Sequence, residues 1–192
     1  MHPFSIDDGL RTRAIIFIFL LSLGLSYLLN VYVLVRFEIV HKIAFIAELS
    51  ALTVFGFIMF LFDRLIWKIL SYFSWIDIPN ISGKWVGYYK SNKDNLNTEV
   101  AIECTIRQTW TKIGVFFRND TVSNSKSLMA CMEFEANPVL RYEYINFSRQ
   151  QNLAIHTGTC KLEYEREKNI LTGEYYNDGH NGHNGIIYLK RK

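Results

Sequence analysis

Two histidines stand three residues apart near the C-terminal end of the sequence, in the segment DGHNGHNG at residues 178–185. Imidazole nitrogens bind zinc, and Asp178 adds one carboxylate close to His180 and His183. A zinc site needs further ligands and rigid supporting contacts, whereas the glycines here give a permissive backbone. The Asn-Gly and other X-Gly pairs supply the positive φ angles of a loop between strands. The spacing therefore favours a connecting loop over a metal site or a catalytic pair.

Other residue types that carry chemistry also lack the spacing of known motifs. The sequence contains no GxxxxGK[ST], GxGxxG, HExxH or GxSxG segment. Cys104, Cys131 and Cys160 are scattered without a CxxC pair, as expected for small core residues in a reducing compartment. The EYERE run at residues 163–167 is typical of a solvated strand face. We therefore predict a protein that is not an enzyme and that uses no metal or cofactor.

The second half of the chain has the period of β-strands. From residue 82 onward, roughly eight runs rich in β-branched and aromatic residues alternate between polar and apolar positions. Turn-forming clusters such as SNKDN and VSNS separate these runs. About eight short antiparallel strands predict a small closed β-barrel, because closure removes exposed strand edges. A β-sandwich is the alternative fold.

The alternation also assigns one face of each strand to the interior. This face is aliphatic along part of each strand, and elsewhere it becomes aromatic and polar. The aromatic and polar positions are Trp85, Tyr89, Gln108, Trp110, Tyr142, Tyr144, His156, Tyr175 and Asn177. A barrel of about eight strands is just wide enough to hold one small ligand. The pattern predicts either a site for a planar, polar ligand or a core packed with aromatic side chains.

The first part of the chain is almost entirely apolar. Residues 14–35 carry no charge, and residues 43–62 carry only Glu48. At ~1.5 Å per residue, each run can cross a hydrocarbon layer of ~30 Å. The first run is too long for a signal peptide, and no small-residue cleavage site follows it. The sequence therefore predicts two transmembrane helices.

The short connector at residues 36–42 predicts an antiparallel helical hairpin with both termini on one side. The distribution of Arg and Lys favours cytoplasmic termini by the positive-inside rule. Residues 63–78 predict an interfacial helix that Pro79 ends. We therefore predict a membrane hairpin over residues 1–78 and a cytosolic β-barrel that binds a ligand over residues 79–192.

Two polar residues lie within the predicted spans. Asn30 is placed to hydrogen-bond across helices. Glu48 either reaches the membrane interface beside Lys42 or contributes to a polar seam between copies of the chain. These residues are our candidates for contacts in a membrane assembly.

The order of several segments resembles a known family. The two apolar runs precede IPNISGKWVGYY, YEYIN, HTGTCKLEY and LTGEYYND, and the chain closes with NGIIYLKR. This order is similar to that of the CD-NTase-associated protein 15 family of bacterial CBASS effectors, which have two transmembrane helices and a β-strand-rich cyclic-nucleotide-binding domain. The resemblance covers essentially the whole chain. The G-x-W motif at residues 83–85 also occurs in lipocalins, but the membrane hairpin departs from that family.

The resemblance implies an antiphage effector of the bacterial inner membrane. A partner nucleotidyltransferase would make a cyclic dinucleotide, and the barrel would bind it. The protein would then oligomerise, and its transmembrane helices would disrupt the membrane and kill the infected cell. Asn30 and Glu48 would supply polar contacts in the assembled bundle. The formal charge of +3 is too small to indicate binding of long nucleic acid.

A cyclic dinucleotide needs surfaces for its bases and partners for its phosphates. Bases stack on aromatic rings for ~1–3 kcal/mol each, and phosphates pair with arginines, hydroxyls and backbone N–H groups. We expect the inward-facing aromatic and polar residues to bind it, with phosphate partners and a lid at the barrel mouth from Arg107, Arg118, Arg141 and His180. The alternatives are a membrane-anchored, lipocalin-like carrier of an apolar ligand and a scaffold without a ligand.

Overall fold

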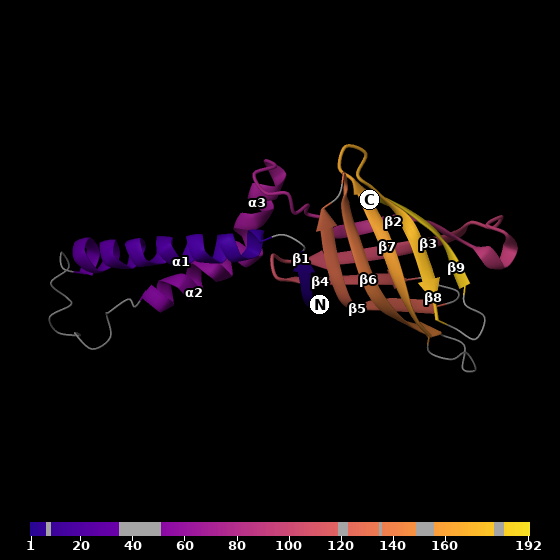
Figure 1. Ribbon diagram of the computed structural model, residues 1–192, viewed down its shortest axis with the longest axis horizontal. Coiled ribbons are helices and arrows are strands. Elements are labelled where there is room, and N and C mark those ends of the chain that lie inside the picture. Colours follow the sequence, from indigo (N-terminus) through magenta and orange to yellow (C-terminus); the bar gives the residue numbers. More distant parts are fainter. Residues whose placement is uncertain (7–8, 35–50, 119–122, 135, 149–155, 179–182) are drawn as a thin grey trace. The chain divides into compact units, whose positions relative to one another are not determined.

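The structure is a computed structural model of the 192-residue chain. It describes residues 1–6, 9–34, 51–118, 123–134, 136–148, 156–178 and 183–192 (Figure 1). The chain forms two compact units. One unit is Gly9–Ile69, and the other combines Met1–Asp8 with Leu70–Lys192.

The larger unit is a closed β-barrel, as predicted from the period-two pattern. In the described residues its order is β1-β4-β3-β2-β9-β8-β7-β6-β5, with an additional pairing between β4 and β5 (Figure 1). The nine strands are β1 (His2–Ile6), β2 (Gly83–Ser91), β3 (Val100–Gln108), β4 (Lys112–Arg118), β5 (Ser123–Phe134), β6 (Pro138–Ser148), β7 (His156–Glu165), β8 (Ile170–Asn177) and β9 (His183–Arg191).

Two details of the predicted barrel were wrong. The barrel has nine strands in the described residues instead of about eight, because the N-terminal strand β1 joins it. The barrel is also mixed, because β1 runs antiparallel to β4 and parallel to β5. The predicted boundary near residue 78 did not anticipate a barrel strand on the N-terminal side of the helices.

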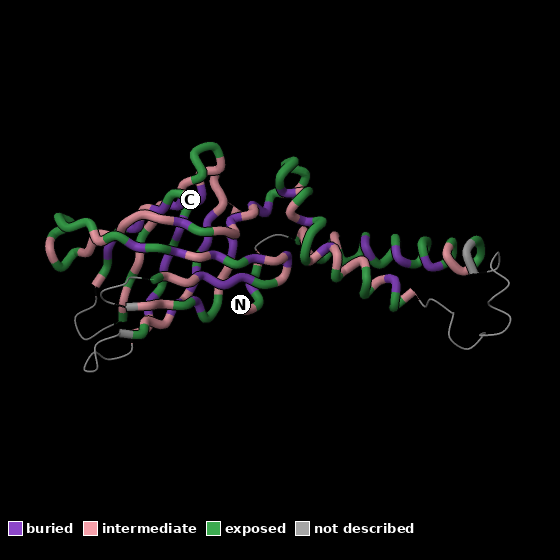
Figure 2. The backbone as a smooth tube through the Cα atoms, turned by 180° about the vertical axis from the view of Figure 1, so that it is seen from behind, coloured by how far each residue is buried: buried purple, intermediate pink, exposed green. Residues whose placement is uncertain are grey.

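The inward faces of the strands form an apolar core. Buried residues alternate with exposed ones along β3, β7 and β9 (Figure 2). Ile106, Leu162 and Leu189, from three different strands, are fully buried. Burial of each such side chain stabilises the fold by ~1.5–3 kcal/mol. Where strands approach closely, Gly173 has no side chain, and a Cβ there would lie 1.8 Å from the carbonyl oxygen of Lys161.

The smaller unit is helical. Its elements are α1 (Leu10–Leu28), η1 (Leu29–Leu34), α2 (Ala51–Leu61), η3 (Phe62–Ile66) and the first residues of α3 (Trp67–Tyr72). α1 and α2 lie side by side, with the rings of Phe19 and Phe55 in edge contact at 5.9 Å (Figure 1). A short η4 helix (Asn92–Asp94) belongs to the barrel unit.

One helix in the described residues, Leu10–Tyr32, is long and apolar enough to cross a membrane. The prediction of two such helices is therefore not met in the described part of the chain. Residues 43–50 of the second predicted span, including Glu48, lie outside the described residues, and the described remainder begins with the 11-residue α2. The helix that follows this segment contains Asp63, Arg64 and Lys68, and their charges lower its apolar character.

The predicted interfacial helix at residues 63–78 is shorter than expected. Helix α3 ends at Tyr72, and Ser74 adopts a left-handed conformation with φ of 55°. The N–H of Trp75 donates to the carbonyl of Leu70 at 2.9 Å, which caps the helix by a Schellman-type bond. The helix therefore ends by local capping several residues before Pro79.

Candidate functional site

The polar part of the barrel interior lies toward one end of the strands. Tyr89 near the end of β2 and Tyr175 near the end of β8 are in edge contact, with ring centroids 5.9 Å apart. Both rings are half-buried, and burial raises the pKa of each phenol. The side chain of Ser91 opposes this rise in the pKa of Tyr175. These two rings therefore present aromatic surface and neutral hydroxyl groups together.

Two amides at the same end of the barrel lack hydrogen-bond partners for their side-chain oxygens. The Oδ1 atoms of Asn146 and Asn177 are both buried and unpaired in the structure. In the sheet register, Asn146 is opposite His156, and Asn177 is opposite Gly158 and His183. A buried acceptor without a partner is costly. The two oxygens are therefore ready to accept hydrogen bonds from a ligand or from water.

His183 adds an imidazole to the same group. It is the first residue of β9 and has the same strand parity as the buried Ile187 and Leu189. Burial, followed by the positive charges of Lys93 and His156, lowers the pKa of His183 below its usual value. An anion placed between these groups would offset that repulsion and favour the charged imidazole.

A deeper layer of the interior consists of weak acids held neutral. Burial raises the pKa of the Cys160 thiol to about 12 and raises the pKa of Tyr142 well above its usual value. Burial likewise raises the pKa of Tyr144, whose hydroxyl donates to the carbonyl of Tyr176 at 3.2 Å. Tyr142 and Tyr144 are in contact, with ring centroids 6.2 Å apart. This layer offers neutral donors and apolar surface.

Three predicted residues lie toward the other end of the barrel and have other partners. Trp85, Gln108 and Trp110 are buried. The indole Nε1–H of Trp85 donates to the carbonyl of Ile81 at 3.0 Å, and Arg191 stacks 4.8 Å above its ring centroid. Gln108 bonds with the backbone of Pro79 and Ile81. The structure therefore does not bring these three residues together with Tyr89 and Tyr175.

The three predicted arginines lie on the outer surface. Arg107, Arg118 and Arg141 are exposed. The guanidinium of Arg107 lies 5.7 Å from the ring centroid of Phe116. Nε of Arg141 donates to Glu133 Oε2 at 2.7 Å in a surface salt bridge. Of these three arginines, Arg118 is the one at a strand terminus, because it ends β4.

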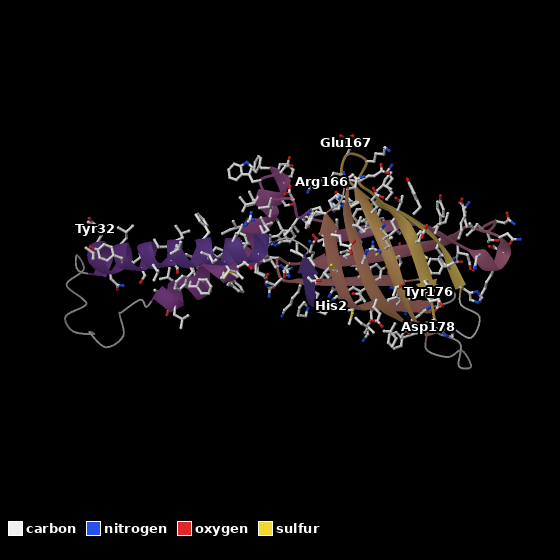
Figure 3. All side chains as sticks on the ribbon, in the orientation of Figure 1. His2, Tyr32, Arg166, Glu167, Tyr176 and Asp178 are labelled. Atoms are coloured by element: carbon white, nitrogen blue, oxygen red, sulfur yellow. The ribbon has the colours of Figure 1, made fainter. Side chains whose placement is uncertain are left out.

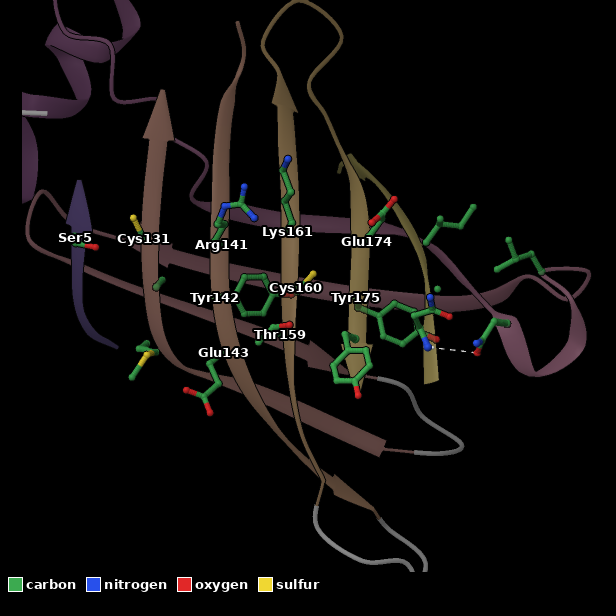
Figure 4. Close-up of a pocket in the computed structure, with 18 residues that line it drawn as sticks. Ser5, Cys131, Arg141, Tyr142, Glu143, Thr159, Cys160, Lys161, Glu174 and Tyr175 are labelled. Carbon is green, nitrogen blue, oxygen red and sulfur yellow. Dashed lines mark hydrogen bonds between the residues drawn. The ribbon is translucent and has the colours of Figure 1, made fainter. Parts of the chain in front are cut away.

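A hollow of about 1000 Å³ runs along β5 to β9 (Figure 4). Its charged lining consists of Arg141 and Lys161 together with Glu143 and Glu174. The lining also includes Tyr142 and Tyr175 from the predicted set. Two acids offset two bases here, so this hollow has no excess positive charge to attract a phosphodiester.

The predicted set thus divides by position along the barrel. Figure 3 shows Tyr176 and Asp178 toward one end of the barrel and Arg166 and Glu167 in the turn at the opposite end. The structure brings together Tyr89, Tyr142, Tyr144, His156, Tyr175 and Asn177 on the inner side of β2 and β6 to β8. His180, the predicted lid residue, lies outside the described residues.

Sequence reasoning left several members of this group unassigned. Asn146 is not among the predicted binding residues, and the sequence predicts that His183 lies in a connecting loop. Ser91 and Lys93 were also missed. The alternation of inward and outward residues could have indicated both Asn146 and His183. Asn146 continues the inward-facing positions of β6, and His183 continues those of β9.

Of the two residues predicted to make contacts in a membrane assembly, Asn30 is described in the structure and Glu48 is not. Asn30 Nδ2 donates to the carbonyl of Ser26 at 2.9 Å on its own helix. Ser22 and Ser26 are buried on the same stripe of α1. Glu48 lies outside the described residues. In the described residues there is also no group of three or more His, Cys, Asp or Glu side chains that would hold a metal ion.

A comparison with protein families agrees with this barrel. Residues 76–191 match the family model described as Cap15, cyclic dinucleotide receptor domain. A search of curated proteins found no match. The family match covers more than half of the chain and nearly all of the barrel from the linker before β2 to the end of β9. The chain therefore belongs to the Cap15 family of cyclic dinucleotide receptor domains.

Proposed function

We propose that this chain is a membrane effector of CBASS antiphage defence whose barrel binds a cyclic dinucleotide at the polar end of its interior. The observation that carries the choice of site is the pair of buried, unpaired oxygens of Asn146 and Asn177 at the end of the barrel where the rings of Tyr89 and Tyr175 also lie. Donors on the base edges of a nucleotide would satisfy the two amide oxygens. The tyrosine rings would stack on the bases for ~1–3 kcal/mol each.

The phosphates would contact the basic groups around His183. Lys93 and His156 both act electrostatically on His183 at this end of the barrel. Lys93 belongs to η4, and the Asn92 side chain of the same helix accepts a hydrogen bond from the N–H of Asn184 at 3.3 Å. That bond connects η4 to the start of β9. A cyclic dinucleotide would therefore meet its base contacts and phosphate contacts within one region.

The apolar carrier is a weaker alternative for this barrel. The aliphatic part of the interior is filled by buried side chains such as Ile106, Leu140 and Leu171. Trp85, which belongs to the G-x-W motif that also occurs in lipocalins, is fully buried and packs against Tyr164 at 6.1 Å between ring centroids. The described interior instead contains two buried amide oxygens, of Asn146 and Asn177, that have no hydrogen-bond partner. A polar ligand could supply these partners, whereas an apolar ligand could not.

The membrane role rests on the helical unit. Leu10–Tyr32 exposes a broad apolar surface that includes Phe17, Leu20 and Tyr27. We propose that this helix and the segment ending in α2 cross the bacterial inner membrane with both termini in the cytoplasm. Ligand binding would then promote oligomerisation of the helices and loss of membrane integrity.

Calorimetry on the full-length chain in detergent micelles tests ligand binding. The full chain is needed because a fragment that begins near residue 80 would lack β1. The panel comprises cyclic di-AMP, cyclic di-GMP, cyclic GMP–AMP and cyclic UMP–AMP, and the corresponding linear dinucleotides are the controls. We expect at least one cyclic member to bind with submicromolar affinity, and binding by none of them would contradict the proposal.

A pair of neighbouring variants locates the site. Tyr175→Ala removes an inward-facing ring, and we expect affinity to fall by about 5- to 150-fold, the equivalent of one lost stacking contact. Tyr176→Ala removes the next ring on the same strand, which is exposed on the outer face, and it should bind as the unmodified chain does. The reverse result would place the ligand in the outer hollow.

A further inference from the structure

Strand β1 fills an opening in the barrel wall between β4 and β5. Among the described residues, these two strands pair directly only near one end, where Phe116, Phe117 and Arg118 are opposite residues 124–126. The register of β5 shifts at a bulge between Ser127 and Met129. Past this bulge, the neighbour of both strands is β1. The wall is therefore continuous only while this opening holds a strand.

The backbone of the opening requires an extended segment. On one side, His2 and Pro3 pair with Ile113 and Lys112 of β4. On the other side, residues 4–6 pair in parallel with residues 130–132 of β5. The N–H of Phe4 also donates to the carbonyl of Thr111 at 3.4 Å. Without β1, two strand edges would present unpaired backbone groups, which is the property that recruits strands from other chains.

The side chains around the opening fit the N-terminal sequence of this chain. Phe4 is 3% exposed and completes the core. His2 Nε2 is hydrogen-bonded to Ser127 Oγ at 2.7 Å, and the same oxygen accepts the N–H of Val115 at 2.9 Å. A Cβ on Gly114 would lie 3.3 Å from the Cα of Met1. The occupant that matches the opening is therefore the segment HPFSI, from the same chain or from a second copy.

We propose that the opening between β4 and β5 is a strand-acceptor surface that also takes β1 of a second copy of this chain. β1 can leave without breaking the ladders between β2, β3 and β6 to β9. The exchanged strand makes the same contacts in a neighbour, so exchange costs little free energy. Confinement of many copies in one membrane raises the effective concentration of acceptors.

Exchange would connect the helical unit of one chain to the barrel unit of another chain. β1 ends at Ile6 and α1 begins at Leu10, so an exchanged strand connects the helix of one chain to the barrel of another. This link supplies a physical route to the assembly of helices. The inference rests on the proposed membrane location, and it does not depend on the identity of the ligand.

The register supplies a direct test through Ser5, which is opposite Cys131 (Figure 4). In a chain with Ser5→Cys alone, the introduced thiol can form a disulfide with Cys131 of the same chain. This disulfide reports that β1 lies in its own barrel. A donor chain with Ser5→Cys and Cys131→Ser lacks the acceptor thiol. Mixed with an acceptor chain that keeps Ser5 and Cys131, it can form this disulfide only between chains.

The mixed chains are reconstituted in vesicles at increasing protein-to-lipid ratios without any nucleotide, and they are oxidised with copper–phenanthroline. We expect a donor–acceptor dimer on non-reducing gels, with a fraction that rises with protein density. Phe4→Asp added to the donor should abolish the dimer. Cys104 and Cys160 are buried in both chains, so they should not form disulfides and serve as internal controls for the oxidation.

Two results would overturn the inference. One is an intrachain disulfide in the Ser5→Cys chain without any donor–acceptor dimer at any density. The other is the absence of this disulfide both within and between chains, which would exclude β1 from the opening. Because the experiment contains no nucleotide, a failure to bind cyclic dinucleotides in calorimetry would not affect its outcome.

Discussion

The side-chain Oε1 of Gln108 accepts a hydrogen bond from the backbone N–H of Ile81 at 2.9 Å, and both residues are buried. Nε2 of the same amide donates to the carbonyl of Pro79 at 3.1 Å. Gln108 ends β3, whereas Pro79 and Ile81 belong to the linker that precedes β2. One amide therefore fixes the linker before β2 to the end of β3.

Replacing this amide should destabilise the barrel. Gln108→Leu leaves the N–H of Ile81 and the carbonyl of Pro79 buried without partners, at ~1–3 kcal/mol each. We expect Gln108→Leu to unfold at a lower urea concentration than the unmodified chain, as measured by intrinsic tryptophan fluorescence. Glu103→Gln on the exposed face of the same strand is the control and should change stability by less than ~0.5 kcal/mol. Equal midpoints for the two variants would contradict the role of Gln108.

A second prediction concerns the close approach of strands at Gly173. Gly173→Ala places a Cβ 1.8 Å from the carbonyl oxygen of Lys161, so β7 and β8 must move apart. We expect a loss of ~1–3 kcal/mol in the free energy of unfolding, as for other overpacked sites. Gly56→Ala in α2 meets nothing within 4 Å and should be neutral or stabilising. Thermal unfolding followed by circular dichroism compares the two, and effects of the same sign and size would refute this packing argument.

The sequence pattern predicted which face of a strand is buried, but it gave no position along the barrel. Ile102, Cys104 and Ile106 alternate with polar residues, and all three are buried as the pattern indicates. Trp85 and Tyr89 share a face of β2, so the pattern grouped them. Their positions along the barrel axis are set by the strand register, which places Trp85 opposite Cys104 and Tyr89 opposite Val100. Register depends on partners distant in the sequence.

The N-terminal strand illustrates a second limit. Residues 2–6 form a short segment with one proline and no long alternation, so local pattern gives no strand signal. This segment becomes a strand because β4 and β5 diverge and leave their edges unpaired. Tertiary context therefore overrides local sequence here, and the ninth strand could not be predicted from periodicity.

A third prediction concerns the aromatic residues at the end of α3. Tyr72, Phe73 and Trp75 are strongly exposed and contact one another, with ring centroids 5.3 Å and 6.1 Å apart. Amphipathic aromatic rings favour the membrane interface. Trp75 is 76% exposed, whereas the other tryptophans are at most 1% exposed. We expect brominated lipids to quench the emission of Trp75 selectively in reconstituted vesicles.

The control for this measurement is Trp75→Phe. This variant keeps an aromatic ring and should lose the quenched component of the emission while the signal of Trp85 and Trp110 remains. If Trp75→Phe is quenched as strongly as the unmodified chain, then Trp75 does not lie in the membrane interface.

A fourth prediction is a pH dependence of ligand binding. Burial and the nearby charges of Lys93 and His156 lower the pKa of His183 from its ordinary value of 6.5. Phosphate at this position would raise that pKa again, so binding would take up a proton. Affinity for the cyclic dinucleotide should therefore increase as the pH falls from about 7.5 toward 5.5. Calorimetry in buffers with different ionisation enthalpies measures the proton uptake.

Stability without ligand should show the opposite trend. The folded chain binds this proton less readily than the unfolded chain, so the contribution of His183 is present above pH 6.5 and declines as the pH falls through that value. His183→Gln should flatten the pH dependence of binding, whereas Asn184→Ala, at the exposed neighbouring position, should retain it. A pH dependence that survives in His183→Gln would assign it to another group.

The central claim is that a cyclic dinucleotide received by the barrel controls the integrity of the membrane. Vesicles made from bacterial inner-membrane lipids, loaded with a self-quenching dye and containing the full chain, measure this directly. On addition of the cyclic dinucleotide that binds in calorimetry, we expect dye release that the linear dinucleotide does not cause and that Tyr175→Ala strongly reduces. Vesicles that stay sealed with the ligand bound, or that leak equally without it, would contradict the claim.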